Sequence, residues 1–379
     1  MPDQHRAGLA TVLREWGRIG CIGFGGPPSH IALFRKLCVD DRGWLDDQEF
    51  EDAIAACNLL PGPASTQLAI FCAWRVRGRA GALVGGAAFI LPGLIAILAL
   101  AALFLGDPPT WVKAAGAGAG AAVAAIALQA GAALIPAGWK RAPHHRRWIA
   151  YLLLGALAAA TVGPWLVLLL VACGVAEVLA QRLPAPTRRR PSAALPLLVV
   201  AGPLLPLAWT ALKVGALSYG GGFVIIPLMQ ADAVDQHHWM TAAEFLNAVA
   251  LGQITPGPVV HTVAVVGYAA AGLVGGLLAA VVAFSPSFAF VLLGADRFDR
   301  LRANRRVRAF LDGAGPAAIG AILGSAVPLI RALTEPWQYA VLAGAVILTL
   351  AARRGPVLTL LTAAAAGVIV VLAGGPLPS

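Results

Sequence analysis

Long apolar stretches separated by short polar turns dominate the chain. Three of them contain no charged residue: Ala80–Leu105, Ala114–Ala137 and Gly272–Ala295. Each is long enough for a helix to cross the roughly 30 Å hydrocarbon core of a bilayer, which takes about 20 residues. A spanning helix satisfies its own backbone hydrogen bonds in lipid. The pattern therefore predicts an all-α polytopic membrane protein.

The basic residues gather in five clusters between the apolar stretches, and these clusters hold 19 of the 28 Lys and Arg residues. The clusters are Arg75–Arg79, Lys140–Arg147, Gln181–Arg190, Asp296–Arg308 and Arg353-Arg354. Because basic loops stay cytoplasmic, their alternation with bare turns places the crossings. The predicted crossings are 80–105, 111–137, 148–161, 165–181, 273–294, 309–330, 337–352 and 356–374. The side of the amino terminus stays open.

Composition removes other classes of protein. Hydrophobic residues make up 59% of the chain and charged residues 12%, against roughly 25% charged in soluble domains. The net charge of +10 therefore indicates membrane topology rather than nucleic-acid binding. The five cysteines form no CxxC pair, and no metal or cofactor motif is present. We expect no metal, cofactor, nucleic acid or catalytic residue; the lipid bilayer is an expected partner, and a homo-oligomer stays open.

The chain contains two related halves. A shift of 195 residues aligns 18–63 with 213–258 without a gap. Of these 46 positions 15 are identical, whereas about one in ten is expected by chance for so biased a composition. The predicted units are a first transmembrane repeat at 1–181, a basic cytoplasmic linker at 182–192 and a second transmembrane repeat at 193–379.

Equivalent turns of the two halves differ in charge. The basic turn Arg75–Arg79 corresponds to the uncharged turn Ala269–Gly272, and the bare turn Gly106–Pro109 corresponds to the basic stretch 296–308. Since basic loops stay cytoplasmic, equivalent turns should lie on opposite sides of the membrane. We therefore predict an inverted-topology repeat. This arrangement is common in secondary transporters, whose binding site lies near the midplane at the repeat interface.

In each half an apolar segment is interrupted twice, first by a glycine cluster and then by Pro-Gly-Pro. Gly adopts conformations that other residues avoid and Pro removes a backbone donor, so both predict broken helices. Such breaks are tolerated in a membrane where they line a cavity, and a fresh helix N-terminus suits an anion. One break could merely kink a helix, but four paired breaks favour a binding pocket. The candidate substrate-binding residues are Phe24, Gly25, Gly26, Pro27, Pro61, Gly62, Pro63, Tyr219, Gly220, Gly221, Gly222, Pro256, Gly257 and Pro258.

Polar residues near the breaks add further candidates. Arg18 aligns with Lys213, and each precedes its glycine cluster by seven residues. A cation inside an apolar segment is costly and therefore indicates function, although snorkelling to the interface is the alternative. Asn58, Gln253 and His261 flank the Pro-Gly-Pro elements. These side chains either bind a substrate or satisfy the unwound backbone.

An intramembrane enzyme acting on an anionic lipid or phosphate is the alternative from another class. It would need an acid and base pair or a nucleophile near the midplane. Glu49 and Glu244 fit helix capping better, because Asp46 and Thr241 stand three residues before them in the spacing of a capping box. The residues therefore favour a transporter over an enzyme.

With these motifs the chain resembles the chromate ion transporter (CHR) family. The residues that carry the resemblance are Phe24-Gly25-Gly26-Pro27, Ser218-Tyr219-Gly220-Gly221-Gly222 and the two Pro-Gly-Pro elements. It covers essentially the whole chain and matches the long, two-domain form. One position departs from symmetry, since Pro27 aligns with Gly222. The resemblance implies a multi-pass protein of the cytoplasmic (inner) membrane that exports chromate and confers chromate resistance.

We therefore expect a secondary transporter that exports chromate, a divalent tetrahedral oxyanion, by alternating access. An interior-negative potential drives anions outward by about 2.3 kcal/mol per charge per 100 mV, so a dianion gains about 4.6 kcal/mol per 100 mV. Proton exchange could add to this driving force. Sulfate or another oxyanion is the alternative substrate, because its size and charge are so similar.

Overall fold

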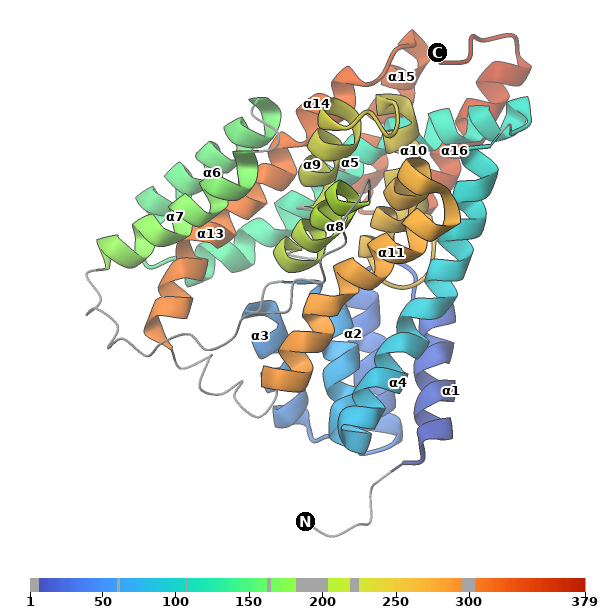
Figure 1. Ribbon diagram of the computed structural model, residues 1–379. Helices are drawn as coiled ribbons and strands as arrows, with labels where there is room; N and C mark the ends of the chain where they lie inside the picture. The colour runs from blue at the N-terminus through green and yellow to red at the C-terminus, as the bar shows by residue number, and fades with distance from the viewer. Residues whose placement is uncertain are drawn as a thin grey trace.

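The computed structural model describes residues 7–59, 62–106, 108–161, 165–181, 204–218, 225–294 and 304–378, and these residues form helices and turns without any strand (Figure 1). The helices before the linker are α1 (Leu9–Ile22), α2 (Pro27–Arg35), η2 (Lys36–Asp41), α3 (Asp47–Leu59), α4 (Ala64–Phe104), α5 (Thr110–Arg141), α6 (His145–Thr161) and α7 (Leu166–Ala180). Those after it are α8 (Leu205–Leu217), α9 (Ile225–Gln230), η4 (Ala231–Gln236), α10 (Ala242–Ile254), η5 (Val259–His261), α11 (Thr262–Gly294), α13 (Arg305–Gly324), α14 (Ala326–Arg331), α15 (Pro336–Val346), η7 (Ile347–Ala351) and α16 (Pro356–Leu372). The predicted all-α class is confirmed.

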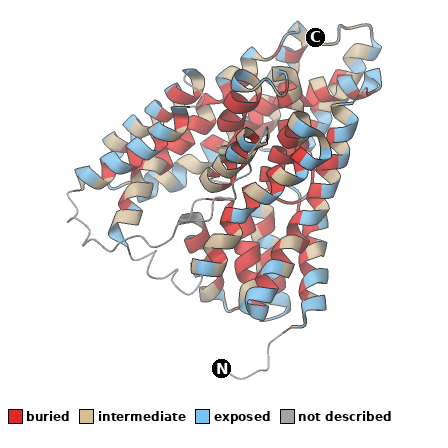
Figure 2. Cartoon of the chain, viewed as in Figure 1, coloured by how far each residue is buried: buried red, intermediate tan, exposed pale blue. Residues whose placement is uncertain are grey.

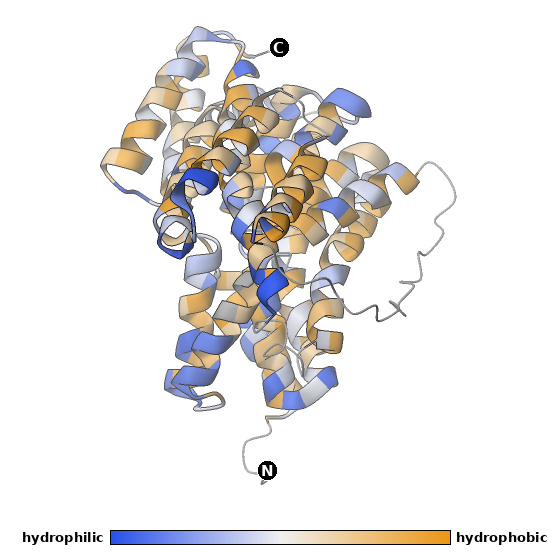
Figure 3. Ribbon diagram, turned by 90° about the vertical axis from the view of Figure 1, so that its left-hand side faces the viewer, coloured by the Kyte–Doolittle hydropathy of each residue, from blue (hydrophilic) through white to orange (hydrophobic). Residues whose placement is uncertain are grey.

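Four helical stretches of the described chain are long and apolar enough to cross a membrane. They are Ala64–Phe104, Thr110–Arg141, Val259–Gly294 and Arg305–Arg331. Large apolar side chains point outward from them, as with Ile95 and Val281, which are 67% and 68% exposed. Figure 2 shows the buried residues where helices face one another, and Figure 3 shows hydrophilic residues mainly at turns and helix ends. An apolar outer surface of this kind suits lipid rather than water.

Two of the long helices fold back on themselves at an outer turn. In α4 the backbone leaves the helix at Arg77 and Gly78, and Gly78 has a φ of +63°. In α11 the equivalent break is at Ala271 and Gly272, where Gly272 has a φ of +61°. After each turn the second segment packs tightly on the first, with Gly81 against the carbonyl of Ala73. Each helix is therefore a short inner segment followed by a longer spanning segment.

The first glycine cluster forms the tip of a helical hairpin. Residues Gly23–Gly26 separate α1 from α2, and η2 continues α2 as a π-helix. The chain then runs back along α1, because Arg42 bonds to Glu15 at 2.8 Å and Trp44 stacks on Trp16. We call α1, α2 and η2 the first glycine hairpin.

The first Pro-Gly-Pro element forms the tip of a second hairpin. Its arms are α3 and the inner segment of α4 (64–76). Glu49 in the first turn of α3 pairs with Arg75 at the end of this inner segment. The start of one arm therefore lies beside the end of the other. The Trp16 indole N–H donates to the carbonyl of Ala69 at 2.8 Å and joins the two hairpins. We call this unit the first proline hairpin.

The second half repeats this order of elements. The bounds of η4 and α10 equal those of η2 and α3 plus 195, and the outer turns at Gly78 and Gly272 differ by 194. Packing repeats as well, since Gly20 meets the carbonyl of Phe89 and Gly215 meets the carbonyl of Ala283. The second glycine hairpin therefore consists of α8, α9 and η4, and the second proline hairpin of α10, η5 and the inner segment of α11. The predicted linker at 182–192 lies outside the described residues.

The two halves interlock rather than pack as separate bodies. Helix α5 packs against α15 and α16 of the second half, whereas α13 packs against α6 and α7 of the first (Figure 1). The spanning segments of α4 and α11 run antiparallel, because Gly86 lies against Phe288 while Leu98 lies against Gly276. Gly62 and Gly257, at the two proline tips, are buried among these elements.

Candidate functional site

The tip of the first glycine hairpin needs glycine. Gly25 and Gly26 have φ values of +92° and +75°, a region that L side chains avoid. Pro27 then opens α2, and no side chain caps this helix end. The Nε2–H of the buried His30 donates to the carbonyl oxygen of Gly23 at 2.9 Å, which braces the tip. Phe24 is 43% exposed. The predicted helix break is therefore confirmed here.

Both Pro-Gly-Pro elements also break the helix as predicted. Gly62 and Gly257 have φ values of +119° and +87°. Pro63 and Pro258 are extended and precede α4 and η5, whose first turns have no side-chain cap. Pro61, Tyr219, Gly220, Gly221 and Gly222 lie outside the described residues, as does the side chain of Asn58.

The tips of the two halves meet inside the protein. The amide N–H of Gly257 donates to the carbonyl oxygen of Gly23 at 2.9 Å, so the second proline tip bonds to the first glycine tip. On the other side, a Cβ on Gly62 would lie 3.4 Å from both the carbonyl oxygen of Gly215 and the hydroxyl of Ser287. The first proline tip therefore lies against α8 and the spanning segment of α11. Breaks that are far apart in the chain form one internal region.

Buried polar groups without partners surround this region. Within the described residues, no hydrogen-bond partner reaches the hydroxyls of Thr66, Ser218 and Ser287, the amide nitrogen of Gln253 or either ring nitrogen of His261. All five residues are buried, and Gln253 at 6% is the most exposed of them. A buried polar group without a partner costs about 1–3 kcal/mol, so five together call for an explanation.

Helix ends add positive potential to the same region. Both α2 and α4 begin at a tip, and their first-turn N–H groups point toward it without a capping side chain. Such N–H groups and the helix dipole favour a negative charge. The region therefore combines backbone N–H groups, hydroxyls, an amide and an imidazole, which is the chemistry that holds an oxyanion.

The two predicted cations have different surroundings. Lys213 is 15% exposed in its side chain, and its Nζ lies 2.5 Å from Oδ2 of the buried Asp232. The Thr210 hydroxyl donates to the same oxygen at 2.7 Å. Arg18 is 58% exposed and lies 3.3 Å from Glu15, one turn earlier in α1. Both cations thus carry a carboxylate partner and flank the tips along α1 and α8.

Other sequence hypotheses can be placed as well. Thr241 and Glu244 form the predicted capping box of α10, and the Asp46 carboxylate accepts from the amide of Glu49 at 2.7 Å. Glu244 and Asp46 are therefore helix caps, whereas the Glu49 carboxylate pairs with Arg75. No group of three or more His, Cys, Asp or Glu residues that could hold a metal ion occurs in the described chain.

Three residues of this region were missed by the sequence analysis. Ser287 lies in a charge-free stretch beside Ser285, where a hydroxyl at membrane depth was the available signal. Glu15 and Asp232 are the counter-ions of the two cations, but they occupy non-equivalent positions. The repeat alignment therefore pairs Glu15 with Thr210 and hides the relationship.

The spanning helices and the enclosed, broken helix ends together define a multi-pass membrane transport protein. The chain belongs to the chromate transporter family, whose family model matches residues 10–178 and 205–368. Members of this family are transporters, not enzymes. The resemblance found from the motifs is therefore confirmed over both halves.

Curated relatives agree with this assignment. A chromate transport protein of Cupriavidus metallidurans is 32% identical over 340 residues, which cover 85% of this chain and 83% of that protein. A chromate transport protein of Pseudomonas aeruginosa is 29% identical over 341 residues, covering 84% and 80%. An uncharacterized transporter of Methanocaldococcus jannaschii is 25% identical over 359 residues, covering 89% and 88%. No solved structure matches the chain significantly.

Proposed function

We propose that this protein is a secondary transporter that exports chromate from the cytoplasm across the inner membrane by alternating access. The observation that carries the proposal is the meeting of the hairpin tips, where Gly257 bonds to Gly23. Broken helices at membrane depth line cavities, and their N-termini attract anions. Because two relatives are chromate transport proteins, we take chromate as the transported anion.

The tips supply the donors that a tetrahedral dianion needs. Chromate has four oxygen acceptors, and the unpartnered hydroxyls of Thr66 and Ser287 and the His261 imidazole are available to them. Hydrogen bonds to a charged group contribute about 1.5–3 kcal/mol each. Arg18 and Lys213 flank the site and offset the negative charge. In this proposal, hydrogen bonds to the anion offset the free-energy cost of burying these polar groups.

An inverted arrangement of the halves gives the site its two alternating openings. The antiparallel packing of the spanning segments of α4 and α11 supports it, because a two-fold axis perpendicular to the helices relates such a pair. The exchange of basic and bare turns between the halves supports the same arrangement. Rocking one repeat against the other would then expose the tips to each side in turn.

The membrane potential is the proposed driving force. Two negative charges that leave an interior-negative cell gain about 4.6 kcal/mol per 100 mV. Exchange for protons would add to this, because protons move inward down the same potential.

Everted membrane vesicles test the proposal. We expect wild-type vesicles to accumulate labelled chromate, and labelled sulfate in a parallel assay shows whether this rival anion is preferred. Ser287→Ala should raise the KM for chromate about tenfold, equivalent to 1.4 kcal/mol, because one donor is lost. Ser285→Ala is the matched control, since Ser285 is exposed on the same helix and bonds to the carbonyl of Val282. Folded protein that accumulates neither anion would refute the assignment.

A further inference from the structure

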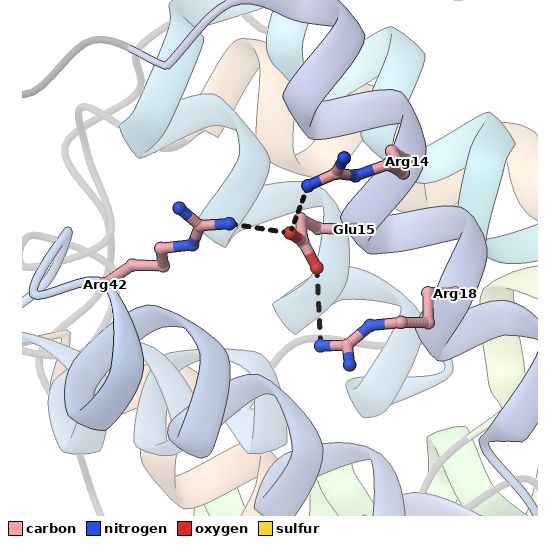
Figure 4. A network of polar contacts seen from close by, with 4 residues as sticks. All are labelled: Arg14, Glu15, Arg18 and Arg42. Atoms are coloured by element: carbon pink, nitrogen blue, oxygen red, sulfur yellow. Dashed lines mark hydrogen bonds and ion pairs between the residues drawn. The ribbon is translucent and has the colours of Figure 1, made fainter.

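A second cluster of charges lies along α1 and just beyond η2, on the outer part of the first glycine hairpin. A cavity of about 520 Å³ is lined by Arg14, Glu15, Arg18, Leu37, Asp41 and Arg42. Figure 4 shows three arginines converging on the single carboxylate of Glu15. Their nearest nitrogens lie 3.4 Å (Arg14), 3.3 Å (Arg18) and 2.8 Å (Arg42) from its oxygens.

One carboxylate, that of Glu15, does not need three arginines as counter-ions. Its side chain is 8% exposed, and the close contact with Arg42 already supplies a counter-ion. Arg14 and Arg18 approach from solvent, with side chains 77% and 58% exposed, so they add little stability. A guanidinium has five N–H donors, and Glu15 accepts only a fraction of those present. The cavity therefore offers unused donors and, with Asp41 counted, one excess positive charge.

The cavity opens on the side that loads an exported substrate. Arg42 follows η2, and the next helix, α3, begins beside the basic turn Arg75–Arg79 through the Glu49–Arg75 ion pair. Basic turns stay cytoplasmic. Three guanidiniums are also too costly to face lipid, so the cavity faces water.

From this geometry we infer that Arg14, Arg18 and Arg42 form a loading site for a divalent tetrahedral oxyanion at the cytoplasmic mouth. The inference rests on the proposed export function and adds a second, outer site to it. Guanidinium groups bind oxyanions with paired, charge-assisted hydrogen bonds. The arriving dianion accepts from the guanidinium donors that Glu15 leaves unused. The tip at Gly23 lies five residues beyond Arg18, about 7.5 Å along α1.

The second half has no equivalent cluster among its described residues. Trp209 and Thr210 stand where Arg14 and Glu15 stand in the first half, and His237 stands for Arg42. Lys213 instead forms an ion pair with the buried Asp232, and this pair has no net charge. The positive cavity is therefore confined to one face of the repeat pair. A loading site that is present only on the cytoplasmic side favours capture of the anion from the cytoplasm, as export requires.

Transport kinetics and direct binding test this loading site. Arg14→Gln is the primary variant because its exposed side chain is dispensable for packing, and Arg42→Gln is the second. Arg79→Gln is the matched control, since Arg79 is an exposed cation of the nearby basic turn. We expect both cavity variants to raise the KM for chromate about fivefold or more, with kcat within twofold and the loss greatest at low ionic strength. The control should match wild type.

Equilibrium dialysis of the purified protein with labelled chromate separates this inference from the proposed function. Wild type should bind two ions per chain at saturation, and Arg42→Gln should bind one. If wild type transports but the cavity variants match Arg79→Gln in KM and stoichiometry, the loading site is wrong and the transporter stands. If wild type does not transport but Arg42→Gln still loses one bound ion, the loading site stands and export is wrong.

Discussion

Glycines with a left-handed backbone occur in two different settings in this protein. Gly62 and Gly257 lie at hairpin tips, whereas Gly78 and Gly272 lie at outer turns. A Cβ on Gly272 would meet nothing within 4 Å, but on Gly257 it would lie 3.1 Å from Cε1 of His261. Alanine at these two positions therefore separates the effect of backbone strain from the effect of steric crowding at the tip.

Gly257→Ala should reduce chromate transport at least tenfold in everted vesicles. The methyl group crowds His261 and disturbs the bond from Gly257 to Gly23. Gly272→Ala carries a similar left-handed strain of about 1–2 kcal/mol but touches nothing, so its transport should stay near wild type. Equal transport by the two variants, at matched amounts of folded protein, would show that the tip geometry is not critical.

At this scale the sequence reveals residues whose role is local. Gly25, Gly62 and Gly257 could be predicted because a helix break follows from the residue type itself. Ser287 could not, because its position beside Gly62 follows from tertiary packing. The bond between Gly23 and Gly257 is likewise invisible in the sequence, since it joins residues that are distant in the chain.

Each glycine hairpin has an ion pair on its outer part. In the first half Glu15 of α1 binds Arg42 beyond η2, and in the second Lys213 of α8 binds Asp232 of η4. Thr210 replaces Glu15 at the equivalent position and donates to Asp232 instead. The carboxylate has moved to the other arm, but each hairpin keeps a cation and an anion across its arms.

Asp232→Asn should destabilise the protein by about 3 kcal/mol, because Lys213 would be left nearly buried without its counter-ion. Thermal unfolding in detergent should show a lower midpoint for this variant. Adding Lys213→Met should recover most of the loss, since the uncompensated charge is then gone. A double variant as unstable as the single one would contradict a role for the pair in holding α8 to η4.

Glu51→Gln is the control for this experiment. Glu51 pairs with Arg35 at 2.8 Å, but both side chains are well exposed, at 58% and 40%. Such surface pairs contribute up to about 1 kcal/mol. Its unfolding midpoint should therefore stay close to that of wild type.

Elements with a simple apolar pattern could be predicted well from the sequence. The expected crossing 80–105 corresponds to the spanning segment of α4, and 273–294 to that of α11. The hairpins over 9–76 could not be placed, because their arms are short and partly polar. Their fold depends on tertiary contacts such as those between Trp16 and Ala69, which no local pattern encodes.

For the whole molecule, the interlocking of the halves ties the tips to the long helices. Because α5 and α13 each pack on the other half, movement of one repeat must change the contacts of both. This coupling suits a transporter that opens one side as it closes the other. The repeated order of elements could be predicted from the sequence, where the two halves align and basic turns of one half correspond to turns without basic residues in the other. The exchange of α5 and α13 could not, because it has no signature in either half alone.

Chromate accumulation should follow the membrane potential. In everted vesicles with a lumen 100 mV positive, movement of two charges allows an accumulation ratio on the order of 10³, from about 4.6 kcal/mol. Exchange for protons would steepen this dependence, because protons move opposite to the anion. A potassium gradient with valinomycin sets the potential, and accumulation that ignores it would contradict electrogenic export.

The most direct test of the central claim is a structure of the protein in a bilayer with chromate bound, with chromium located by its anomalous scattering. We predict chromium among the hairpin tips, within hydrogen-bonding reach of Thr66, His261 and Ser287. Occupancy of the outer arginine cavity as well is compatible with this result. Chromium found only outside the tips, with Gly23 and Gly257 still bonded and the tip hydroxyls still without a partner, would contradict the account.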